Sequence, residues 1–112
     1  MTVSTHVLDA SLGAPAAGIT VTLARLAGGW LAVESGVTGA DGRHRFAAAT
    51  AAGTYRLTFA TGAYFTARAV EAFYPEVTVT FTIAQPPAGA AAGHCHVPLL
   101  LSPFAYSTYR GS

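Results

Sequence analysis

Histidines are the residues of this chain that best combine type and spacing for acid–base chemistry, and the chain has four of them. His94 and His96 lie two residues apart, and side chains two apart on a β-strand point to the same face. If Val3 and Val7 face the core, His6 points outward as well. An imidazole titrates near neutral pH, so outward histidines in a cleft can act as general acid and base. The alternative for each is a structural histidine whose nitrogens are satisfied by neighbours or water.

Arginines supply a second candidate chemistry. Arg43 follows a predicted Asp41-Gly42 hairpin turn and shares a strand face with Arg45. A guanidinium can hold a planar anionic substrate through two parallel hydrogen bonds. A solvated arginine is the alternative. The chain has no lysine, which excludes Schiff-base chemistry and a lysine general base.

The His94-Cys95-His96 run also raises a zinc site and a cysteine nucleophile as alternatives. The zinc signal is weak, because there is no His-Glu-X-X-His motif and no second cysteine. Neighbouring residues on a strand point to opposite faces, so we expect Cys95 to fill the core rather than react. A single cysteine also excludes an internal disulfide.

The chain ends in Tyr109-Arg110-Gly111-Ser112, after a long apolar run at 96–103. Chain ends fray unless contacts repay the entropy of ordering them, and this end is rich in groups that make contacts. The ring and hydroxyl of Tyr109 can cover a flat ligand, and Ser112 offers a hydroxyl beside a carboxylate. The tail is therefore a candidate wall of a pocket. The alternative is an amphipathic last strand with an ordinary tip.

Composition limits the possible classes of protein. A chain of 112 residues is long enough for one domain, and it is 52% hydrophobic but only 10% charged, against about a quarter for an ordinary soluble domain. No stretch approaches the roughly 18 apolar residues of a membrane span, so the apolar surplus predicts subunit interfaces. A net charge of +1 without a basic cluster disfavours nucleic acid. The N-terminal residues show no basic or long apolar signal region, which predicts a cytoplasmic protein.

Alternation of apolar and polar residues predicts the elements that position these side chains. Glycine and proline clusters separate the alternating segments, which is typical of an all-β sandwich. Residues 64–73 lack clean alternation, and we expect one short helix there. The predicted strands are 3–8, 19–24, 30–33, 43–47, 55–59, 77–83, 94–101 and 106–109.

Several motifs along the chain resemble the transthyretin-like family, and the terminal Tyr-Arg-Gly-Ser resembles its 5-hydroxyisourate-hydrolysing branch rather than the hormone carriers. The resemblance implies an all-β, two-sheet transthyretin/prealbumin-like sandwich of seven to eight strands with one short helix. It also implies a single domain over residues 1–112, assembled as a homotetramer with sites between dimers. The motifs are Thr5-His6-Val7-Leu8-Asp9, Asp41-Gly42-Arg43, Phe73-Tyr74-Pro75-Glu76-Val77, His96-Val97-Pro98-Leu99-Leu100-Leu101-Ser102-Pro103 and Tyr106-Ser107-Thr108-Tyr109-Arg110-Gly111-Ser112.

The resemblance also implies the residues of the site. His6, Arg43 and His96 are the catalytic candidates, and His6, Arg43, Tyr109 and Ser112 the substrate-binding ones. A histidine of the His6/His96 pair would activate water, and Arg43 would bind the substrate anion and stabilise the oxyanion. The ring of 5-hydroxyisourate would open to give 2-oxo-4-hydroxy-4-carboxy-5-ureidoimidazoline.

Other expectations follow from the same resemblance. No metal or organic cofactor is needed, and the expected partner is the small-molecule substrate, without nucleic acid or membrane. The family gives His94 no comparable role, and Cys95 departs from the aromatic residue expected at its position. The alternative function is a non-catalytic carrier of a small ligand.

Overall fold

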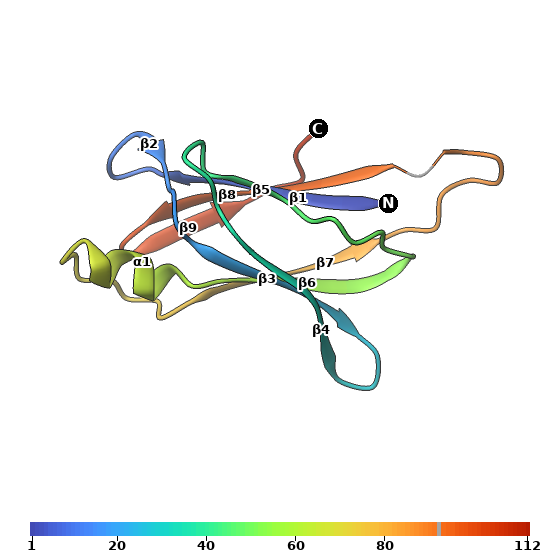
Figure 1. The fold of residues 1–112 in the computed structure, drawn as a ribbon, viewed down its shortest axis with the longest axis horizontal. Coiled ribbons are helices and arrows are strands. Elements are labelled where there is room, and N and C mark those ends of the chain that lie inside the picture. The colour runs from blue at the N-terminus through green and yellow to red at the C-terminus, as the bar shows by residue number, and fades with distance from the viewer. Residues whose placement is uncertain (92) are drawn as a thin grey trace.

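Two β-sheets pack face to face in the computed structural model, which describes residues 1–91 and 93–112 (Figure 1). One sheet has the order β2-β1-β8-β9, with β5 also paired to β1, and the other has the order β4-β3-β6-β7. The first sheet comprises β1 (Thr2–Asp9), β2 (Ala14–Pro15), β5 (Arg43–Arg45), β8 (His94–Ser102) and β9 (Ala105–Thr108). The second comprises β3 (Thr20–Leu26), β4 (Trp30–Val37), β6 (Gly53–Phe59) and β7 (Val77–Ile83).

The prediction of an all-β two-sheet sandwich with one short helix is confirmed. A strand lies in each of the eight segments predicted from alternation, and the described residues add one strand, the two-residue β2. Strand β2 is too short to produce a period of two in the sequence, which is why alternation did not reveal it.

The core lies between the two sheets and consists of the inward residues of the alternating strands. Val3 and Val7 are fully buried, so His6 between them points outward, as the alternation predicts. Thr5 is also buried on the inner face, and its hydroxyl donates a hydrogen bond of 2.7 Å to the carbonyl oxygen of Val97. That bond satisfies a polar group that would otherwise be costly to bury.

Strands β1 and β8 run parallel, whereas the other strand pairs are antiparallel. In this parallel pair Thr2 lies opposite His94, Ser4 opposite His96, and His6 opposite Pro98. Outward residues of β1 therefore meet outward residues of β8 every second position. This register positions the candidate site described below.

The single described helix, α1 (Thr61–Ala67), begins and ends earlier than the predicted 64–73, so the predicted bounds were wrong. The helix contains Gly62, although glycine was taken in the sequence as a residue that separates elements. Its N–H donates to the carbonyl oxygen of Pro75 at 3.0 Å, and a Cβ on Gly62 would lie 2.4 Å from that oxygen. Glycine is therefore needed for close packing here rather than for a turn. This helix is not long and apolar enough to cross a membrane, and neither is any other helical stretch among the described residues.

Asp9 connects the end of β1 to this helix. Its carboxylate accepts hydrogen bonds from Ser11 and Leu12 in the following turn and, at 2.8 Å, from the hydroxyl of Tyr64 in α1. Burial alone raises the pKa of the Asp9 carboxyl, but these hydrogen bonds outweigh burial and lower the pKa. Burial and the neighbouring carboxylate raise the pKa of Tyr64 to about 12. Asp9 therefore closes a turn and holds the helix, and it does not contact His6.

Candidate active site

Three strands bring the candidate residues together on the outer face of the first sheet. Strand β1 lies in the centre, where His6 is opposite Arg43 of β5 and Ser4 is opposite both Arg45 of β5 and His96 of β8. Side chains on one face recur every second residue, so the three strands form a continuous polar patch. The C-terminal tail rises from this face, away from the second sheet (Figure 1).

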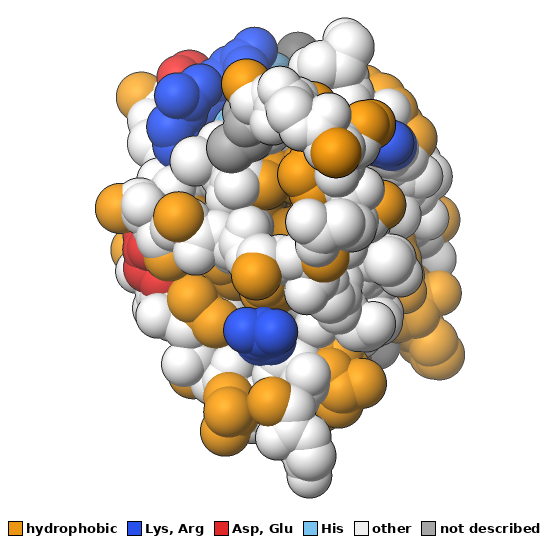
Figure 2. Space-filling view, turned by 90° about the vertical axis from the view of Figure 1, so that its right-hand side faces the viewer, with side chains coloured by type: hydrophobic (Ala, Val, Ile, Leu, Met, Phe, Trp, Pro, Cys, Tyr) orange, Lys and Arg blue, Asp and Glu red, His pale blue; other side chains and the backbone are white. Residues whose placement is uncertain are grey.

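The patch surrounds a pocket of about 450 Å³. All five residues that sequence analysis proposed for the site line this pocket, together with four others. Arginine side chains gather at the upper left of Figure 2, on the layer that contains β1 and β8. Among the described residues, no group of three or more histidine, cysteine, aspartate and glutamate side chains is arranged to hold a metal ion. The lining residues are Ser4, His6, Arg43, Arg45, His94, His96, Tyr109, Gly111 and Ser112.

A tight turn before β5 aims Arg43 into the pocket. The Asp41 carboxylate accepts a hydrogen bond of 3.0 Å from the Arg43 N–H. There is no room for a side chain at Gly42, because a Cβ there would lie 2.4 Å from the carbonyl oxygen of Val7. The Gly42 carbonyl in turn accepts a hydrogen bond of 2.8 Å from the Val7 N–H. With φ of +75°, this position favours glycine on both counts. The turn thus docks onto β1 directly beside His6.

His96 is the best-defined imidazole of the site. Its Nδ1 lies 2.8 Å from the Ser4 hydroxyl oxygen, in hydrogen-bond contact, which leaves Nε2 for the pocket. Burial, followed by the positive charge of Arg43 and the neighbouring His94 and His6, lowers the pKa of His96. The neutral, proton-accepting form of His96 is therefore favoured at neutral pH.

Ser4, Arg45, His94 and Gly111 line this pocket although sequence analysis did not place them in the site. Two of them, Ser4 and His94, are joined to His96 by hydrogen bonds. The Ser4 hydroxyl oxygen lies 2.7 Å from His94 Nε2 as well as 2.8 Å from His96 Nδ1, and the Thr2 hydroxyl oxygen lies 2.6 Å from His94 Nδ1. Their period-two spacing is visible in the sequence. The parallel register that brings the β1 residues beside the β8 residues is not visible in the sequence, because it depends on a pairing between residues about 90 positions apart.

The C-terminal tail docks against β8 through its backbone. The Gly111 N–H donates to the His96 carbonyl oxygen at 2.9 Å, and the Thr108 hydroxyl donates to the Pro98 carbonyl oxygen at 2.7 Å. A Cβ on Gly111 would lie 2.4 Å from Cδ2 of the His96 ring. The φ of Gly111 is not positive, so glycine is required here because the backbone lies directly on the imidazole and not because of a turn.

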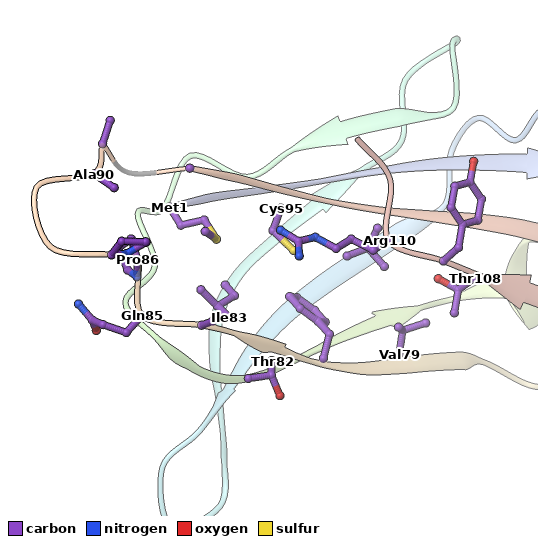
Figure 3. Close-up of a pocket in the computed structure, with 17 residues that line it drawn as sticks. Met1, Val79, Thr82, Ile83, Gln85, Pro86, Ala90, Cys95, Thr108 and Arg110 are labelled. Atoms are coloured by element: carbon purple, nitrogen blue, oxygen red, sulfur yellow. The ribbon is translucent and has the colours of Figure 1, made fainter.

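Arg110 points away from this pocket. Figure 3 shows its side chain reaching between the sheets toward Cys95, in an apolar cavity of about 510 Å³ lined by β7, β8 and the loop between them. Burial raises the pKa of the Cys95 thiol, and the charge of Arg110 opposes that rise. Cys95 therefore faces away from the polar pocket, as strand alternation predicts. His44 also lies outside the pocket, with its ring packed edge-to-face on Phe46 at 4.6 Å.

Comparisons with known proteins assign this chain to a family. The HIUase/Transthyretin family matches residues 3–111 of the chain. The chain belongs to the HIUase/Transthyretin family. A probable 5-hydroxyisourate hydrolase of Caenorhabditis elegans is 46% identical, over 98% of this chain and 80% of that protein.

Solved structures of the HIUase/Transthyretin family have the same fold. Klebsiella pneumoniae 5-hydroxyisourate hydrolase aligns with a TM-score of 0.85 at 42% identity, covering the whole of both chains. Sea bream transthyretin, solved with thyroxine, aligns with a TM-score of 0.87 at 32% identity, covering 97% of this chain and 93% of that one. The fold alone therefore does not separate the hydrolases from the carriers, and the residues of the pocket must do so.

Proposed function

We propose that this protein is an enzyme that hydrolyses 5-hydroxyisourate. One observation carries the proposal: three imidazoles, two guanidinium groups and the C-terminal tail line one pocket on the outer face of the first sheet. Relatives that are 42–46% identical over nearly the whole chain bear the name 5-hydroxyisourate hydrolase. A pocket of about 450 Å³ also has the size of a small-molecule site.

The mechanism begins with a water molecule activated by a histidine of the His6/His96 pair. The imidazole takes a proton from water as the oxygen attacks the ring carbonyl. Arg43 binds the anionic urea-like edge of the substrate and stabilises the charge that develops on the carbonyl oxygen. Collapse of this intermediate breaks the ring C–N bond, the protonated histidine supplies the leaving nitrogen with its proton, and a carboxylate results. The product is 2-oxo-4-hydroxy-4-carboxy-5-ureidoimidazoline.

Tyr109 and Ser112 complete the substrate site. The Tyr109 ring can cover a flat heterocycle, while its hydroxyl and that of Ser112 can bond to the polar edge. The proposed chemistry uses general acid–base groups and a guanidinium and needs no metal or organic cofactor. Dialysis against a strong chelator should therefore leave the rate unchanged, and loss of activity that zinc restores would contradict this point.

The direct test uses freshly made 5-hydroxyisourate, generated from urate by uricase. Its decay, followed by ultraviolet absorbance, should be faster with the protein than without it. The matched control is the Arg43→Gln variant, which lacks the guanidinium while the turn and the strand remain. The decay of the substrate with this variant is compared with the decay with the wild-type protein. Equal decay with and without the wild-type protein would reject the proposed function.

A homotetramer built from one transthyretin-like domain per chain is the assembly that we propose. Support comes from the low charge of the chain and from its exposed apolar side chains, whose coverage would be favourable. Sedimentation should give a mass near four chains, and a clean monomer at micromolar concentration would reject the assembly. The cytoplasmic location stays a prediction. The exposed apolar residues include Leu12, Leu31, Val37, Phe73, Phe104 and Tyr109.

A non-catalytic small-ligand carrier is the second candidate, favoured by the likeness to sea bream transthyretin. A carrier of an apolar ligand has no need of imidazoles that converge on arginines. Stoichiometric binding of the substrate without its turnover would favour this candidate over the hydrolase.

A further inference from the structure

An unbroken line of four hydrogen-bonding side chains crosses from β1 to β8 and back on the outer face of the first sheet. Going inward, the line runs from Thr2 to His94 at 2.6 Å, to Ser4 at 2.7 Å, and to His96 at 2.8 Å. The two imidazole rings lie nearly parallel, with centroids 6.4 Å apart, and the Ser4 hydroxyl bridges them. His94 is exposed, whereas His96 is only partly accessible, so the line connects the inner imidazole to solvent.

The single hydroxyl proton of Ser4 couples the two rings. A hydroxyl can donate to only one of two nitrogens and must accept from the other. If Ser4 donates to His96 Nδ1, then His96 carries its proton on Nε2 and cannot accept one there while it remains neutral. If Ser4 donates to His94 Nε2 instead, then His96 Nδ1–H donates to Ser4, and His96 Nε2 has a free lone pair toward the pocket. Only the second arrangement makes His96 a base.

We propose that Ser4 and His94 are positioning residues for this proton acceptor: they set the tautomer of His96 and pass its proton to solvent. The inference rests on the proposed hydrolysis for its catalytic meaning, whereas the coupling of the two imidazoles can be measured without substrate.

The proton transfer balances along the line. When His96 Nε2 takes a proton from the attacking water, its Nδ1–H proton moves to the Ser4 oxygen, and the Ser4 hydroxyl proton moves to His94 Nε2. His96 ends neutral with its proton on Nε2, Ser4 keeps one proton, and His94 becomes the imidazolium. The exposed His94 then releases its Nδ1 proton to water. When His96 gives its Nε2 proton to the leaving nitrogen, the transfers along the line run in reverse, and a proton from water returns to His94 Nδ1, which restores the starting arrangement.

Electrostatics favour moving the charge to the outer ring. His96 shares its pocket with Arg43, Arg45 and His6, and Tyr109 and Ser112 also line it. The guanidinium of Arg43 disfavours a positive charge on His96. His94 lines the same pocket but is exposed, so water solvates a positive charge there better than on the partly buried His96. The line thus allows a histidine beside two arginines to accept a proton without staying charged.

The first experiment replaces Ser4. Ser4→Ala should lower kcat by about 10- to 100-fold with little change in KM, less than the loss expected for the base itself, since the imidazole stays but its tautomer is no longer set. Ser4→Thr is the matched control, because it keeps the hydroxyl and should restore most of kcat. Equal losses in both variants would show that the site needs the size of serine rather than its hydroxyl, and would overturn the proposal.

The second experiment does not depend on activity or on how Ser4 variants fold. In protein labelled with ¹⁵N-histidine, the nitrogen NMR spectrum should place the His96 proton on Nδ1 at neutral pH, and the titrations of His94 and His96 should be coupled. His94→Gln, at an exposed position, should move the His96 proton toward Nε2 and remove the coupling. Independent titrations in the wild type, or an unchanged His96 tautomer in His94→Gln, would overturn the relay.

These readouts separate the two proposals. A wild-type protein without hydrolysis but with coupled imidazoles would reject the function and leave the coupling in place. An active wild type whose Ser4→Ala variant keeps the full kcat and pH profile would reject the relay and leave the function in place.

Discussion

His6 and His96 are the side chains on which the proposed chemistry depends most directly. We expect His6→Ala and His96→Ala each to lower kcat by roughly 10²-fold or more, the usual scale for a general acid–base group. Folding should survive, because both residues point away from the core. Steady-state kinetics on freshly generated substrate would check this expectation.

His44→Ala is the control for these variants. The His44 ring packs on Phe46, and its Nε2 is buried without a hydrogen-bond partner among the described residues. The substitution should lower the free energy of unfolding but leave the turnover of the folded protein nearly unchanged. A kcat loss in His44→Ala as large as that in His96→Ala would show that the assignment of strand faces is wrong.

The environment of His96 gives a pH prediction of its own. Burial and Arg43 lower the pKa of His96, so its titration in the folded protein should lie below the ordinary value of 6.5, and Arg43→Gln should raise it. Because the unfolded state then binds more protons, this histidine should make the fold less stable as pH falls below 6.5. Histidine NMR titration of both proteins would measure the shift. A His96 pKa that is the same in both proteins would contradict the role of Arg43 as a source of the shift.

At the scale of elements, sequence predicted the strands and the faces that they bury but not how the strands pair. Alternation placed Val3 and Val7 inside and His6 outside, because a strand repeats every two residues wherever it lies. The role of Ser4 was not predictable, since it arises from a parallel register between distant segments. The helix bounds were wrong for a related reason: the need for glycine at position 62 comes from its contact with Pro75, which local sequence does not reveal.

The contact between Tyr64 and Asp9 predicts the stability of the junction between β1 and α1. Tyr64→Phe removes the hydrogen bond to a buried carboxylate and should lower the free energy of unfolding by about 2 kcal/mol at neutral pH. The difference should narrow above pH 10: the wild-type unfolded state ionises Tyr64 there, whereas the folded state holds the pKa at about 12. Denaturant unfolding of both proteins across this pH range is the measurement. Equal stability at neutral pH would show that the bond contributes nothing.

At the scale of the whole molecule, we expect the C-terminal tail to be needed for activity but not for assembly. Deleting residues 109–112 should abolish hydrolysis while a folded tetramer remains, because β8 and β9 pair upstream of the deleted segment. Activity and sedimentation, measured on the same sample, would check both parts. Full activity in the truncated protein would reject a role for the tail in the pocket.

Gly111→Ala is the narrower version of this test. A Cβ at that position would overlap the His96 ring, so the variant should lose activity although only a methyl group is added. Wild-type activity in this variant would show that the tail and the imidazole are not held against each other.

The pairing of β1 with β8 has a consequence for the order of folding. Ser4 and His96 are 92 residues apart, so the groups of the site meet only after the chain has closed a loop of nearly its full length. The second sheet joins strands that are closer in sequence, and its β3–β4 hairpin can form early. On a ribosome, the first strand would emerge long before its central partner exists. Catalytic activity should therefore be acquired in the final stage of refolding. In a stopped-flow experiment, recovery of activity should lag behind the change in fluorescence of Trp30, which lies in the β3–β4 hairpin.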